Sequence, residues 1–167
     1  MKWLIIVFVI MSLIGSVMWV MPTPRQRFQA HLRLKARTLG LQVQLVTLKL
    51  PRMTGEMEGE SISVPAYRLL RTNLSRAQKE SWCSWQVCRG ETLANTGLGQ
   101  GWSWITGEGL LPGTVLEHVN AVLERLPDDV VALESTPIHM TAFWHESDEA
   151  TLERLAGILK ELVEVRV

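Results

Sequence analysis

The stretch IHMTAFWHESDEATLERLAGILKELV, residues 138–163, carries the clearest structural pattern in this 167-residue chain. Its first nine residues, 138–146, are rich in apolar and aromatic side chains and predict a strand. Asp148 then stands where a helix N-cap is favoured. Apolar residues follow at spacings of three and four, which predicts an amphipathic helix. The buried face of this helix is expected to consist of Leu152, Leu155, Ala156, Leu159, Leu162 and Val163.

Upstream segments carry the same two kinds of pattern. Strands are expected at 41–48, 64–72, 81–89, 102–105 and 130–135. Thr114 and Glu117 form a Thr-x-x-Glu capping box that opens a helix, and Pro127 ends it. Residues 51–63 are rich in Gly, Glu and Ser and predict an exposed, mobile loop. Strands in runs with few helices predict an α+β domain over 41–167, with a mainly antiparallel sheet and two to three helices.

The N-terminal segment is apolar and uncharged from Trp3 to Met21. A helix of this length is about 28 Å long, close to the thickness of the hydrocarbon core of a bilayer. Trp3 and Trp19 stand near its two ends, where aromatic rings favour the membrane interface. No small-x-small pair precedes a plausible signal-peptidase cut. The segment therefore predicts an uncleaved transmembrane anchor over residues 1–22.

A basic block follows this segment and contains no acidic residue. Its members are Arg25, Arg27, Arg33, Lys35 and Arg37. Residues 23–40 are expected to form a juxtamembrane helix whose cations interact with the lipid surface. The positive-inside rule then predicts a single-pass protein of the bacterial inner membrane with a cytoplasmic C-terminal domain. The net charge of the whole chain is zero, which argues against a nucleic-acid partner.

The segment MPTPRQRFQAHLRLKAR, residues 21–37, continues the apolar run with Pro and a basic stretch. This layout resembles the start of YajC, the small accessory subunit of the bacterial preprotein translocase, and more generally proteobacterial single-pass membrane proteins. The resemblance covers about forty residues. It implies one inner-membrane span, a cytoplasmic C-terminal domain and a role accessory to a membrane complex.

The residues that usually carry chemistry do not form a recognisable set. His139 and His145 lie six residues apart on one predicted strand, too far for one metal ion. Cys83 and Cys88 are not spaced as a CxxC pair, and no second Cys/His pair completes a zinc site. The glycines of residues 97–101 match neither a P-loop nor a dinucleotide-binding loop. We therefore expect no enzymatic activity, no cofactor and no metal.

The tryptophans leave two interpretations open. Trp102, Trp104 and Trp144 either fill the core or present an aromatic surface to a partner. We expect a protein-interaction domain that binds another membrane protein or complex. The alternative is a membrane-tethered enzyme or small-ligand sensor with a pocket near Trp102, Trp104, His145 and Glu146. Convergence of these four side chains would distinguish the alternative.

Overall fold

The computed structural model describes residues 2–55 and 57–165, with only the backbone described at 17–20. The chain forms two compact units, Met1–His31 and Leu32–Val167. The second unit contains the end of helix α2 and all of the later elements.

Helix α1 spans Lys2–Val20, and its described side chains are exposed, Trp3 at 79%. No helix among the described residues combines the length and the apolar character needed to cross a membrane. This finding overturns the predicted transmembrane anchor over 1–22. It also overturns the expected single-pass inner-membrane localisation with a cytoplasmic C-terminal domain. The side chain of Trp19, the second expected interfacial anchor, lies outside the described residues.

Helix α2 spans Pro24–Thr38, within the helix expected over 23–40. The backbone N–H of Gln26 donates to the Thr23 hydroxyl at 3.3 Å, and the Thr23 N–H donates to the Gln26 side chain at 2.9 Å. These reciprocal bonds form a capping box and satisfy two donors at the helix start.

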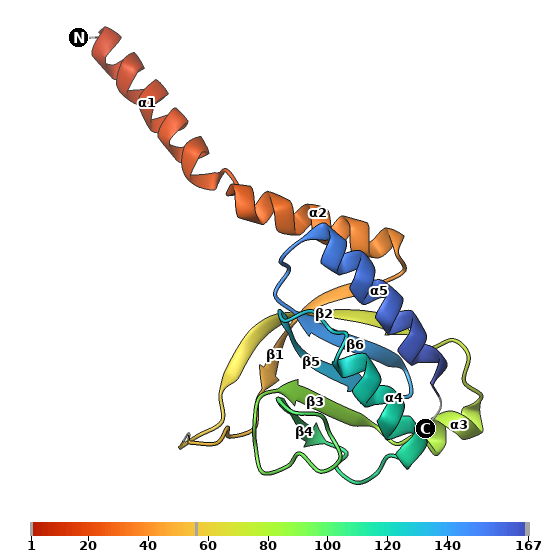
Figure 1. Ribbon diagram of the computed structural model, residues 1–167. Helices are drawn as coiled ribbons and strands as arrows, with labels where there is room; N and C mark the ends of the chain where they lie inside the picture. Colours follow the sequence, from red (N-terminus) through yellow and green to blue (C-terminus); the bar gives the residue numbers. More distant parts are fainter. Residues whose placement is uncertain (1, 56, 166–167) are drawn as a thin grey trace. The chain divides into compact units, whose positions relative to one another are not determined.

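The second unit is a small α+β domain built on one six-stranded sheet. Its strands are β1 (Gln42–Lys49), β2 (Ser61–Leu70), β3 (Trp85–Arg89), β4 (Trp102–Thr106), β5 (Val130–Ser135) and β6 (His139–Trp144). Their order in the sheet is β1-β2-β6-β5-β3-β4, and every neighbouring pair is antiparallel. β1 and β4 are therefore the two edge strands. Figure 1 shows the sheet with helices over one of its faces.

Three further helices belong to this unit. They are α3 (Arg76–Glu80), α4 (Gly113–Leu123) and α5 (Glu149–Glu164), so the described residues contain five helices in all. Asp148 caps α5 as expected, accepting a hydrogen bond from the Thr151 N–H at 2.8 Å. The capping box predicted for α4 is wrong, because Pro112 occupies the N-cap and makes no side-chain cap bond.

The helices and one face of the sheet enclose the main core. Apolar side chains of α4 and α5 and the end of α2 pack there against inward-facing residues of the strands. A smaller apolar cluster lies on the opposite face, around Val64, Cys88 and Phe143, where Met53 from the β1–β2 connection packs against it. Both faces of the sheet thus carry buried side chains. Unpaired backbone groups are expected at the two edge strands, because every inner strand has a neighbour on each side.

Candidate functional site: the free edge of strand β1

The outer edge of β1 carries backbone groups without a partner. The Leu50 N–H donates to the Glu60 carbonyl at 2.8 Å, so this pair is a hydrogen-bonded pair of the β1–β2 ladder. Hydrogen-bonded and non-hydrogen-bonded pairs alternate in an antiparallel ladder. The even-numbered residues of β1 therefore face β2, and Val43, Leu45 and Thr47 direct their N–H and C=O groups outward. No backbone hydrogen bond from the described residues reaches this outer edge.

The other side of β2 confirms this alternation. The Arg71 N–H donates to the Ile138 carbonyl at 2.8 Å, in register with the β2–β6 ladder. Odd-numbered residues of β2 therefore face β6. Pro65 is odd-numbered and lacks an N–H, and the β2–β6 pairing stops at Ala66 next to it.

The opposite edge of the sheet is covered. On β4, the Trp104 N–H donates to the Ala94 carbonyl at 2.7 Å, and the Trp102 N–H donates to the Gly99 carbonyl at 3.3 Å. The segment before β4 thus occupies edge groups that a further strand would need. β1 has no equivalent cover within the described residues.

β1 also lacks most of the devices that protect an edge strand. Its sequence, QVQLVTLK, contains no proline and a single charge, Lys49, at its end. Its register with β2 runs without a bulge over all eight residues. Leu45, at the middle of the outward-facing groups, is 65% exposed. A long, regular and partly apolar edge is a template for pairing with another strand.

A cavity of about 360 Å³ lies at the beginning of this edge. It is lined by Arg37, Gly40, Leu41, Gln42 and Val43. Gly40 adopts φ +86° and ends α2; its N–H donates to the Arg37 carbonyl at 3.0 Å. The Leu41 N–H donates to the Ala36 carbonyl at 2.9 Å. These two bonds form a Schellman motif, which places the Arg37 side chain beside the first residues of β1.

The cations beside β1 are not neutralised. Arg37 and Lys49 are exposed, and neither belongs to any ion pair among the residues that the structure describes. β1 itself contains no acidic residue. The edge therefore combines free backbone groups with positive charge at both of its ends.

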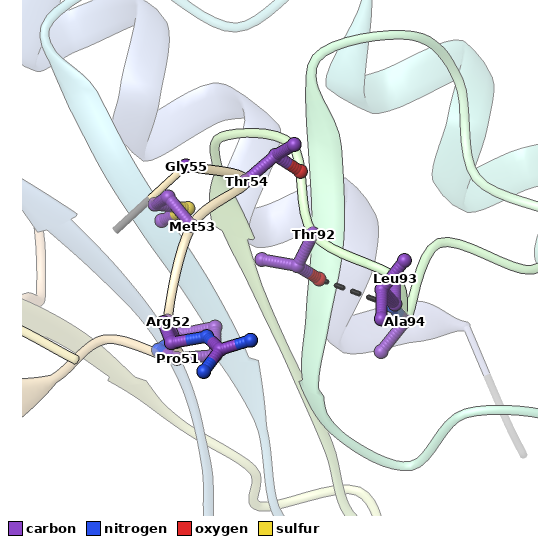
Figure 2. A pocket seen from close by; sticks show the side chains of 8 residues that line it. All are labelled: Pro51, Arg52, Met53, Thr54, Gly55, Thr92, Leu93 and Ala94. Atoms are coloured by element: carbon purple, nitrogen blue, oxygen red, sulfur yellow. Dashed lines mark hydrogen bonds between the residues drawn. The ribbon is translucent and has the colours of Figure 1, made fainter. Parts of the chain in front are cut away.

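A second cavity, of about 380 Å³, lies between the connection that follows β1 and the connection that precedes β4 (Figure 2). Thr54 donates its N–H and its hydroxyl to the Glu91 carbonyl, at 2.9 and 3.0 Å. Ala94 donates its N–H to the Thr92 hydroxyl at 3.1 Å. Among the described residues that line it, Arg52 is the one with a charged side chain. These residues offer no set of converging polar groups, so we assign the cavity no chemistry.

Glu146 lies in a buried polar cluster that the sequence did not predict. Its side chain is 0% exposed and accepts hydrogen bonds from Arg33 at 2.7 and 2.9 Å and from the Tyr67 hydroxyl at 2.8 Å. Its hydrogen bond raises the pKa of Arg33, and burial first, then Glu146, raises the pKa of Tyr67. The cluster ties α2 to the end of β6. All three groups are satisfied by one another, which is typical of a structural site.

The pocket suggested by the sequence is not formed. Trp102 and Trp104 lie on β4, which β5 and β3 separate from β6. At a spacing of about 4.8 Å between strands, this separation is roughly 14 Å. His145 is exposed, whereas Glu146 is buried beneath Arg33. The four side chains therefore do not converge on one cavity.

The three tryptophans expected either in the core or at a partner surface are core residues. Trp102, Trp104 and Trp144 are 5%, 3% and 0% exposed. Trp104 also makes an edge-to-face contact with Trp85, and Trp144 makes one with Tyr67. Their side chains are buried within the unit and do not present an aromatic surface.

The basic block divides among several environments. Arg25 and Arg27 are exposed in the first unit. Arg33 pairs with Glu146, and Lys35 pairs with two carboxylates of α5, those of Glu149 and Glu153. Arg37 alone among the five lines the cavity at β1. Three cations expected to act on a lipid surface thus contact the domain or line its cavity.

This site is only partly predictable from the sequence. The basic block includes Arg37 and the alternation over 41–48 predicts a strand, but neither pattern places one beside the other. Gly40 is the residue that marks a helix end next to Arg37, because glycine favours the left-handed conformation just past a helix. No group of three or more His, Cys, Asp or Glu side chains among the described residues is placed to hold a metal ion.

Comparison of the chain with protein-family models, with characterised proteins and with solved structures found no match.

Proposed function

We propose that this protein is a protein-interaction domain that binds an extended segment of another protein by adding it as a strand to β1. The observation that carries this proposal is the uncovered, regular outer edge of β1, with outward-facing backbone groups at Val43, Leu45 and Thr47. Main-chain hydrogen bonds supply affinity in this mode of recognition, and neighbouring side chains supply specificity.

Two features support β1 over the other edge. β4 already receives backbone hydrogen bonds from the segment before it, so a partner strand would have to displace that segment. Leu45 is exposed beside the free edge and would lose contact with water when a strand is added. The partner segment is therefore expected to place an apolar side chain next to Leu45.

A site-specific crosslink tests the proposal. A photoreactive benzophenone amino acid replaces Leu45 in the full chain, and the same residue replaces Leu110 in a control, since Leu110 is 57% exposed and follows β4, the strand at the opposite edge of the sheet. Irradiation in the producing cells should give an adduct with another protein from position 45 and not from position 110. An adduct of two copies of this chain, or no adduct at position 45, would overturn the proposal.

The second arm tests the backbone pairing. Thr47→Pro removes an outward-facing donor and leaves the β1–β2 ladder intact, because the Thr47 N–H points away from β2. The adduct at position 45 should disappear in this variant while its thermal unfolding stays cooperative. An adduct that persists would show binding to side chains alone and would contradict strand addition.

A further inference from the structure

We propose that the segment added to β1 is the C-terminal end of the partner protein. This segment runs antiparallel to β1, and its free α-carboxylate binds in the cavity at Arg37. This inference rests on the proposed function, because it takes strand addition as given and names the chemistry of the ligand. Charge, backbone geometry and strand direction support it separately.

Charge at the edge favours an anionic partner. Arg37 and Lys49 stand at opposite ends of β1 without ion pairs among the described residues, and β1 has no acidic residue. Partners meet with complementary potentials, and a cationic segment would be repelled from both ends of the edge. The segment is therefore expected to carry negative charge at both ends.

The lining of the cavity includes donors that fit an anion. The backbone N–H groups of Gly40 and Leu41 are used by carbonyls of α2, and the backbone N–H of Gln42 faces β2. The other donors of the described lining are the Gln42 side-chain amide, the outward-facing N–H of Val43 and the Arg37 guanidinium, and of these the guanidinium alone carries a charge. A guanidinium fork fits a carboxylate with two parallel hydrogen bonds. Backbone N–H groups capture terminal carboxylates in other recognition sites in the same way.

The direction of the added strand decides which end reaches this cavity. An antiparallel strand places its C-terminal end at the beginning of β1, whereas a parallel strand places its N-terminal end there. Only the antiparallel arrangement brings a terminal carboxylate to Arg37. The edge available for pairing also ends at this point, because α2 turns into β1 through Gly40. A chain that terminates there matches the length of the edge.

The register then specifies the ligand further. If the last residue of the segment faces Val43, its third-last residue faces Leu45 and its seventh-last faces Lys49, since opposed residues advance together along an antiparallel pair. An apolar side chain is favoured at the third-last position, because Leu45 is exposed. An acidic side chain is favoured at the seventh-last position, opposite Lys49.

Two peptides test the carboxylate. Both are fluorescein-labelled nonapeptides with glutamate at the seventh-last position, valine at the third-last and last positions, and threonine or serine elsewhere; one ends in a free acid and the other in an amide. Fluorescence anisotropy with the full chain should show the acid binding at least about tenfold more tightly than the amide. Equal affinities would overturn carboxylate capture and leave strand addition standing.

Charge-matched variants test the role of Arg37. Arg37→Gln should abolish the difference between the acid and the amide while leaving binding of the amide unchanged. Arg52→Gln, which removes one exposed cation from the second cavity, should preserve the difference. A difference that survives in Arg37→Gln would overturn the assignment.

The two levels of the proposal fail differently. Failure of both peptides to bind up to about 1 mM, with the position 45 adduct still formed and still lost in Thr47→Pro, would overturn the C-terminal ligand alone. Absence of the adduct at position 45, or its persistence in Thr47→Pro, would overturn strand addition. The C-terminal ligand would then be overturned as well.

Discussion

At the scale of single residues, Glu146 joins parts of the chain that are far apart in sequence. It accepts bonds from Arg33 of α2 and from Tyr67 of β2 at the end of β6. It also adopts φ +59°, a backbone conformation that costs energy for a residue with a side chain. The hydrogen bonds of its carboxylate offset this cost.

Glu146→Ala should therefore lower the free energy of unfolding by about 1–3 kcal/mol. Removal of the Glu146 carboxylate leaves the buried Tyr67 hydroxyl without its acceptor, whereas Arg33 can form hydrogen bonds with water because it is partly exposed. Glu146→Gln keeps an acceptor and should cost less. Urea unfolding of the two variants measures the difference, and an equal cost for both would show that the hydrogen bonds contribute nothing.

At the scale of elements, the junction between α2 and β1 depends on the conformation of Gly40. Gly40 has open space around a hypothetical Cβ, so its requirement is conformational rather than steric packing. Gly157 lies inside α5, also with open space, but in an ordinary helical conformation. The two glycines form a matched pair.

Gly40→Ala should destabilise the protein by about 1–2 kcal/mol, because φ +86° strains any residue with a Cβ. Gly157→Ala should stabilise it by about 0.5–1 kcal/mol, since alanine is the better helix former. Thermal unfolding of both variants checks the signs. A neutral Gly40→Ala would mean that the helix end can relax without the Schellman geometry.

Regular elements with a strong local signal could be predicted from the sequence. β5 occupies the expected residues, and Asp148 caps the last helix as expected. α3 was missed because five residues are too few to show helical periodicity. At α4, the Thr114 capping box was outweighed by Pro112, which holds the N-cap one residue before the helix starts.

The site could not be predicted because it depends on strand order. β1 is an edge because it pairs with β2 alone, while the rest of the sheet continues from β2 through β6, a strand far from both in the chain. Alternation within β1 predicts a strand but not its neighbours. Burial of Trp102 and Trp104 likewise depends on residues distant in the chain, since both belong to the apolar cluster that includes Val119 and Val122 of α4.

At the scale of the whole molecule, stability should depend on the charge of His139. Burial first, then the nearby Arg68, lowers the pKa of His139, and this outweighs the raising effect of Glu134. The unfolded chain therefore binds a proton more readily than the folded one. The free energy of unfolding is then largest above the unfolded pKa, about 6.5, and falls as the pH drops below it.

His139→Gln removes this contribution and should flatten the pH dependence between about pH 7 and pH 5 relative to the unsubstituted protein. Denaturant unfolding of both proteins across this range measures the contribution of His139, because the carboxylates titrate in both proteins and cancel in the comparison. A decline of equal slope in the two proteins would contradict the assignment.

The pairing of β2 with β6 also sets the order in which the protein can fold during synthesis. The β1–β2 hairpin is local and can form as soon as both strands have emerged, but β2 gains its second neighbour only after residues 139–144 have been made. For that interval the nascent sheet has two open edges. Pro65 lies on the edge of β2 that later pairs with β6, and it lacks the N–H that this edge would otherwise expose. The residue next to the end of the β2–β6 ladder therefore also makes β2 a poorer template for aggregation until β6 has been made.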